Sequence, residues 1–186
     1  MRRFIVVLAI AMVGCAALAQ ESGGLSPKAG AYSESLYTNV YFSFNFKVPQ
    51  KWNVTWVAKD GPCGRECMLL DVRHPAYPKP MQMIQVTAEA VQPQASMREA
   101  SAGVFLVQAG AKKLNEPKEL LVNGLTFYRT DYRSQLANAD LFQTLIVMPG
   151  KEYTAVFAFA ANSRKDVDGM IDDFGKAFSK MGARQD

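Results

Sequence analysis

Two apolar runs joined by a tight turn constrain the fold of this chain more than any other feature. Segments 141–148 and 151–160 flank Pro149-Gly150, a pair that favours a turn. Both runs are apolar on either side, and in the first one the alternating residues are Leu141, Leu145 and Val147 against Phe142, Ile146 and Met148. A strand of this kind belongs in a sheet whose two faces are both covered. The sequence therefore predicts a central hairpin with other elements packed above and below it.

Other segments show the period-2 pattern of half-buried strands. Segment 40–48 alternates and places on one side the residues Phe42, Phe44, Phe46 and Val48. Further strands are expected at 52–57, 68–73 and 82–91, the last with one apolar side formed by Ile84, Val86, Ala88 and Ala90. Between 120–122 and 125–128, Asn123-Gly124 is typical of a two-residue hairpin turn, because both residues tolerate positive φ.

Two helices are expected. Ser96 and Glu99 have the spacing of a capping box, which predicts a helix from Met97 to about Ala109. A second helix begins at Ser163, and its apolar positions have helical spacing at Val167, Met170, Ile171, Phe174, Ala177, Phe178 and Met181. Together the elements predict an α+β fold, in which a mainly antiparallel sheet carries a mid-chain helix and a C-terminal amphipathic helix.

The first 19 residues have the pattern of a secretory signal peptide. Arg2 and Arg3 precede an apolar run at 4–14, and Ala17-Leu18-Ala19 before Gln20 is a typical cleavage site. In an alternative interpretation, Cys15 is lipidated and anchors the chain to a membrane. Segment 20–39 is expected to be a flexible arm, and 40–182 a single α+β domain. We therefore expect an exported protein, periplasmic or secreted, with a membrane-anchored lipoprotein as the alternative.

The charge pattern argues against nucleic acid as a partner. Loss of Arg2 and Arg3 would leave 21 − 2 = 19 basic residues against 17 acidic ones, a net charge of +2 instead of +4. The remaining basic pairs, Lys112-Lys113 and Arg164-Lys165, are too short for a nucleic-acid stripe. The sequence contains none of the common nucleotide-binding, metalloprotease or hydrolase motifs, so we expect neither an enzyme nor a cofactor.

Two cysteines form the most unusual segment. Cleavage at Gln20 would discard Cys15 and leave Cys63 and Cys67, which in an oxidising compartment predict a disulfide. In an alternative interpretation, the chain is a metal-binding protein, and these cysteines and His74, the only histidine, form a soft-metal site. Thiolate and imidazole ligands suit Cu(I). A thiol redox pair is the remaining interpretation.

Aromatic and acidic residues supply the other candidate sites. Trp52, Trp56 and Tyr128 are candidates for a ligand or partner surface, although even spacing on one strand face predicts that at least one Trp is in the core. A glycoside hydrolase would need a carboxylate pair drawn from residues such as Glu89, Asp131 and Asp140. We expect these acids to be ordinary solvated strand and loop residues instead.

Segment 39–181 resembles the PsbP-like group, which comprises photosystem II extrinsic proteins and bacterial exported or lipoprotein relatives of unknown function. The residues that carry the resemblance are Tyr37-x-Asn39, Phe42-x-Phe44 and Pro49-x-x-Trp52. The order of a mid-chain helix, a four-strand meander and a closing helix is also similar. The resemblance implies an exported, non-catalytic binding or accessory module of the cell envelope, whose partner is an envelope protein or a small ligand. It does not imply photosystem binding, since no functional residues match.

Overall fold

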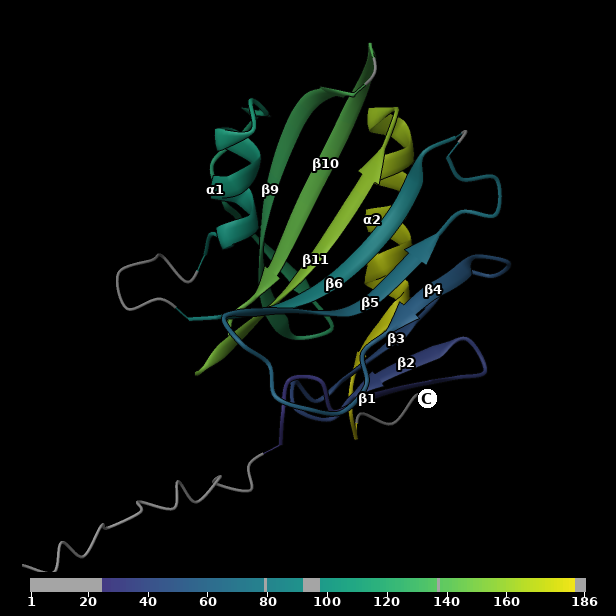
Figure 1. The fold of residues 1–186 in the computed structure, drawn as a ribbon, viewed down its shortest axis with the longest axis vertical. Coiled ribbons are helices and arrows are strands. Elements are labelled where there is room, and N and C mark those ends of the chain that lie inside the picture. Colours follow the sequence, from purple (N-terminus) through teal and green to yellow (C-terminus); the bar gives the residue numbers. More distant parts are fainter. Residues whose placement is uncertain (1–24, 79, 92–97, 137, 183–186) are drawn as a thin grey trace, which may run out of the picture.

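A computed structural model describes residues 25–78, 80–91, 98–136 and 138–182. The N-terminal strands in chain order are β1 (Gly30–Ser33), β2 (Leu36–Asn39), β3 (Phe44–Lys47), β4 (Asn53–Val57), β5 (Glu66–Arg73) and β6 (Gln82–Ala90). They are followed by α1 (Ser101–Gln108), β7 (Lys112–Lys113), β8 (Lys118–Val122), β9 (Leu125–Leu136), β10 (Ala139–Met148), β11 (Tyr153–Ala161), α2 (Arg164–Ala177) and β12 (Phe178–Lys180). Figure 1 shows the strands gathered into two layers, with α1 and α2 well apart from each other.

The strands form two antiparallel sheets. The larger sheet has the order β4-β5-β6-β11-β10-β9-β7, with β8 paired to β9, and the smaller has the order β1-β2-β3-β12. Every strand pairing in both sheets is antiparallel. The structure therefore confirms the predicted α+β class.

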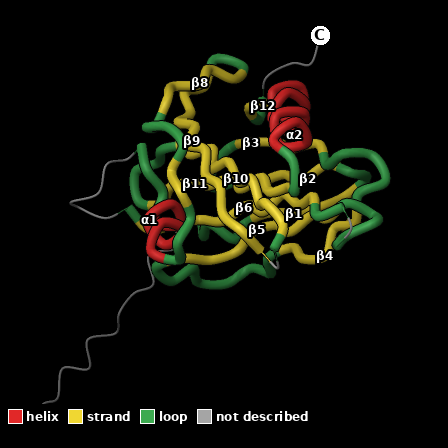
Figure 2. The backbone as a smooth tube through the Cα atoms, turned by 90° about the horizontal axis from the view of Figure 1, so that it is seen from above, coloured by secondary structure: helices red, strands yellow, loops and turns green. Residues whose placement is uncertain are grey.

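The central hairpin is covered on both sides, as its sequence predicts. Ile146 and Met148 of β10 enter a large core shared with α2 and the smaller sheet, and we call this side of the larger sheet the α2 face. Leu145 and Val147 point the other way into a smaller core beside α1, on what we call the α1 face. Figure 2 shows α1 and α2 on different sides of the larger sheet.

Phe157 of β11 lies at the centre of the large core. Its ring centroid is 5.0–6.4 Å from those of five other phenylalanines, Phe44, Phe46, Phe127, Phe174 and Phe178. These rings come from both sheets and from α2. The cluster therefore joins the three layers through aromatic packing.

Both predicted hairpin turns are confirmed. Asn123 and Gly124 join β8 to β9 with φ of 48° and 76°, the conformation that this pair favours. The turn after Pro149 joins β10 to β11. A third turn, between β9 and β10, was not predicted; it contains Asn138 with φ of 66°.

The expected flexible arm is wrong for residues 30–39, which form β1 and β2. Tyr37 and Asn39 are fully buried there, and Asn39 Nδ2 donates to the carbonyl of Pro27 at 2.8 Å. Segment 40–48 is also less regular than its alternation suggests. Only Phe44–Lys47 forms a strand, because the chain turns at Ser43, where φ is 55°.

Both helices differ from their predicted bounds. The first helix begins at Ser101 instead of Met97; Ser96 and Met97 of the expected capping box lie outside the described residues. The second begins as expected, with the Ser163 side chain accepting from the Asp166 N–H, but it ends at Ala177. Phe178 is buried, as predicted, but it lies in a strand and not in the helix, since β12 pairs with β3.

Candidate functional site

Cys63 and Cys67 form the predicted disulfide. Their Cα atoms are 5.6 Å apart, and the Cys67 side chain is buried against the large core. The hydroxyl of Tyr153 donates to the carbonyl of Cys63 at 2.7 Å and lies 3.1 Å from that of Gly64. The disulfide loop is therefore attached to the beginning of β11.

The structure does not bring His74 to this pair. Cys67 is the second residue of β5, whereas His74 follows its last residue, Arg73. At about 3.3 Å per residue the two are roughly 20 Å apart. The His74 ring lies 5.6 Å from that of Trp52, and its Nδ1 accepts from the Ala76 N–H at 3.1 Å. Across the described part of the chain, no group of three or more His, Cys, Asp or Glu residues could hold a metal ion.

Removing the disulfide will lower stability modestly. We expect the Cys63→Ser and Cys67→Ser double variant to lose about 2 kcal/mol of unfolding free energy, because a loop this short restricts the unfolded chain only slightly. Urea denaturation of the variant and of the oxidised and reduced wild-type protein measures this loss. The reduced protein serves as the control and should match the variant. Equal midpoints for all three would show that the bridge does not form in solution.

The three candidate aromatic residues do not form one surface. Trp52 is half-buried against the large core, whereas Trp56 is 53% exposed on the α1 face. A bulge between Val54 and Trp56 changes the alternation of β4, so the prediction that the two tryptophans share a face is wrong. Tyr128 packs on the smaller core with the guanidinium of Arg98 over its ring, 5.3 Å from the centroid.

Glu89 holds the beginning of α1. Its carboxylate accepts from the N–H groups of Ser101 and Ala102 at 2.6 and 3.1 Å, and only 4% of the residue is exposed. Burial raises the pKa of Glu89, and these hydrogen bonds partly offset the rise. Glu89, a residue of β6, thus accepts hydrogen bonds from the free N–H groups at the start of α1, a role that the sequence assigned to the capping box. Glu99 instead accepts from Lys113 Nζ at 2.9 Å.

Asp131 of β9 is the centre of a buried polar network. Only 2% of it is exposed, and it accepts hydrogen bonds from Thr144 at 2.6 Å, Asn115 at 2.7 Å, Arg164 at 2.9 Å and Arg129 at 3.0 Å. Burial opposes ionisation of Asp131, but the hydrogen bonds from Thr144 and the two arginines outweigh it and hold its pKa below the usual range. Both arginines also pair with Asp168 of α2. The network therefore ties β9 to the start of α2.

The three candidate acids do not all lie on one face of the sheet, and the expectation that they are solvated is wrong for Glu89 and Asp131, which are buried. Glu89 lies on the α1 face, because its partner in the sheet, Thr154, alternates with residues of the large core. Asp131 and Asp140 lie on the α2 face, where Asp140 pairs with Arg133 at 2.7 Å. Glu89 therefore cannot pair with either of them across the sheet.

A pocket that the sequence does not predict lies at one end of the two-sheet sandwich. It has a volume of about 510 Å³, and we call it the sandwich-end pocket. Its apolar walls include Tyr41, Phe42, Leu125, Met148 and Tyr153, and its charged residues are Lys151, Glu152 and Lys180. A second hollow of about 400 Å³ lies between β3 and α2 and includes Trp52. The residues of the first pocket come from four separate segments, so no local pattern predicts it. Its two tyrosines, Tyr41 and Tyr153, are the only sequence signal for it.

Comparison with known proteins places the fold. No family model matches the chain, and no curated protein is similar to it in sequence. The solution structure of cyanobacterial PsbP (CyanoP) from Synechocystis is similar, with a TM-score of 0.54, 14% identity, and 81% of this chain and 95% of that one covered. LpqN of Mycobacterium tuberculosis, described as involved in cell envelope biogenesis, has a TM-score of 0.44 and 10% identity over 74% of this chain and 83% of its own.

The fold and site define an α+β protein built as a two-sheet sandwich. It has the PsbP-like fold that the sequence resemblance implied. In the described ranges, neither helix is long and apolar enough to cross a membrane.

Proposed function

We propose that this chain is an exported, non-catalytic binding or accessory module of the cell envelope. The observation that carries the proposal is the commitment of its buried carboxylates to structural partners. Glu89 holds α1, and Asp131 holds α2 through two arginines. The sandwich-end pocket, in contrast, is lined by Lys151 and Lys180, which make no ion pair within the described residues, and by apolar side chains, a combination that suits binding.

Export is supported by two independent features. The leader at 1–19 has the pattern of a signal peptide, and the Cys63–Cys67 bridge suits an oxidising compartment. Cleavage before Gln20 would release the module, whereas lipidation of Cys15 would anchor it to a membrane. The expected partner is an envelope protein or a small ligand.

Native mass spectrometry tests binding against catalysis. The purified protein is incubated with a low-molecular-weight extract of bacterial envelopes, and heat-unfolded protein serves as the control for non-specific adducts. We expect a compound that binds one-to-one to the folded protein and is recovered unchanged. Time-dependent conversion of extract components at catalytic protein concentrations would contradict the proposal and indicate an enzyme.

A further inference from the structure

The sandwich-end pocket begins where the large core ends. Phe44 is fully buried, whereas the preceding Tyr41 and Phe42 are half-buried and line the pocket. The Tyr41 ring packs edge-on against Phe42 and Tyr153, with centroid distances of 4.8 and 6.0 Å. The result is an aromatic wall continuous with the core but open to a ligand.

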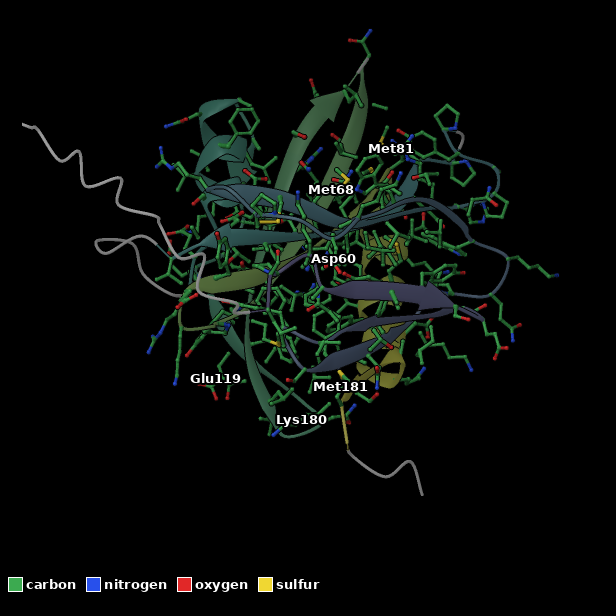
Figure 3. The ribbon with its side chains drawn as sticks, turned by 60° about the horizontal axis from the view of Figure 1, so that its bottom comes forward. Asp60, Met68, Met81, Glu119, Lys180 and Met181 are labelled. Carbon is green, nitrogen blue, oxygen red and sulfur yellow. A yellow bond between two sulfur atoms is a disulfide. The ribbon has the colours of Figure 1, made fainter. Side chains whose placement is uncertain are left out.

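Two lysines, Lys151 and Lys180, line the pocket. Lys151 lies in the turn after β10, and Lys180 is the last residue of β12, where Figure 3 labels it beside Met181. Within the described chain, neither makes an ion pair, whereas Lys113 and Lys176 do. Glu152 also lines the pocket. Two lysines against one glutamate leave a net charge of +1 at the pocket.

Glu152 lies close to the aromatic wall. The pKa of Tyr41 is raised first by burial and then by the charge of Glu152. The carboxylate of Glu152 therefore interacts with Tyr41, and it would repel an anion bound in the pocket.

The frame of the pocket is fixed before any ligand arrives. Tyr153 is held by the carbonyls of the disulfide loop, and the Met181 N–H donates to the Ser43 carbonyl at 2.9 Å. The turn that carries Lys151 requires Gly150, since a Cβ there would lie 2.0 Å from the Tyr153 carbonyl oxygen. A preformed site loses less freedom on binding.

We propose that this pocket binds a small organic anion. Its apolar, ring-containing body would lie against Tyr41, Phe42 and Tyr153, and its acidic group would lie near Lys151 and Lys180. The inference rests on the proposed binding function and specifies its ligand class. The volume of about 510 Å³ lies within the range of roughly 300–1,000 Å³ that is usual for small-ligand sites. The second hollow has the same net charge, from Lys47, Lys176 and Asp173. Its Lys176 is paired with Asp173 at 3.4 Å, whereas neither lysine of the sandwich-end pocket makes an ion pair in the described chain.

Two fluorescent probes that differ in charge test the proposal. Anilinonaphthalene sulfonate carries an aromatic body with an acidic group, and N-phenyl-1-naphthylamine carries the same body without it. We expect the wild-type protein to bind one molecule of the sulfonate. The Lys151→Met and Lys180→Met double variant should bind the sulfonate about tenfold more weakly and the neutral probe within about twofold of wild type. Glu152→Gln should strengthen sulfonate binding about twofold, because it removes the opposing charge.

A matched variant keeps the test specific. Lys47→Met with Lys176→Met removes the same charge at the second hollow and should leave both affinities unchanged. Equal loss in both double variants, or no loss in the first, would overturn the proposal. Equal loss of both probes in the first variant would do the same, since the lysines would then act on the pocket walls.

Salt dependence of the wild-type protein gives a second test that needs no variant. Raising the salt concentration from about 0.05 to 0.5 M should weaken the sulfonate several-fold and spare the neutral probe. An equal salt dependence for both probes would contradict the proposal that the lysines bind the acidic group. An envelope compound that stays bound to the Lys151→Met and Lys180→Met variant would refute this pocket while leaving the binding function intact.

Discussion

Replacing Asp131 with alanine will lower the free energy of unfolding by about 2–4 kcal/mol, because it removes a buried carboxylate and leaves two partly exposed arginines without their shared partner. Arg129 and Arg164 contact Asp131 at 3.0 and 2.9 Å, and the carboxylate is almost fully buried. Asp168 alone would remain to balance both guanidinium groups. Urea denaturation, monitored by tryptophan fluorescence, measures the loss.

Asp140→Ala is the matched control for this change. Asp140 lies on the same sheet face and pairs with one arginine, Arg133, but this pair is exposed to solvent. Its removal should leave the denaturation midpoint nearly unchanged. Equal effects of the two substitutions would show that the Asp131 network does not support the fold.

The Asp131 contribution should also depend on pH. Its pKa is lower in the folded protein than in the unfolded chain, where an aspartate titrates near 4. The stabilisation is therefore fully present above about pH 4 and is lost as the pH falls through the lowered folded pKa. We expect the stability difference between wild type and Asp131→Asn to be largest near neutral pH and to shrink in acid. A difference that grows in acid would contradict the assignment.

Phe157→Ala is expected to be the other severe substitution, with a loss of about 3–5 kcal/mol. The ring is fully buried and contacts aromatic residues of both sheets and α2, so its removal leaves a cavity where three layers meet. Phe105→Ala on α1 is the control, since Phe105 is 68% exposed and should cost less than about 0.5 kcal/mol. Guanidinium denaturation compares the two. Similar costs would mean that the layers are not joined through Phe157.

The central parts of the fold could be predicted because their patterns depend on nearby residues. The alternation of 141–148, the Asn123-Gly124 turn and the spacing of Val167 to Phe174 each report a local face. The errors occur where distant contacts decide. Residues 36–39 form a strand that pairs with β1 and β3, and Asn39 also bonds to the carbonyl of Pro27. Phe178 fits a helical spacing although its backbone pairs with β3.

The Asp131 network and the contacts of Glu89 were harder to predict, because the residues that form them are far apart in the sequence. Arg164 reaches Asp131 across 33 residues, and Glu89 caps a helix that begins 12 residues later. No spacing rule connects such pairs. The β4 bulge likewise reverses the side on which Trp56 lies without any local signal. The disulfide was the exception, since two nearby cysteines behind an export leader predict it.

The most direct test of an exported, disulfide-bridged module is the intact mass of the full chain, produced in a bacterium with its own leader and purified without reductant. We predict residues 20–186, lighter by the two hydrogens lost in the Cys63–Cys67 bridge, recovered from the periplasmic fraction. A lipid mass on Cys15 would assign the anchored form of the same module. An uncleaved chain in the cytoplasm with free Cys63 and Cys67 thiols would contradict the account.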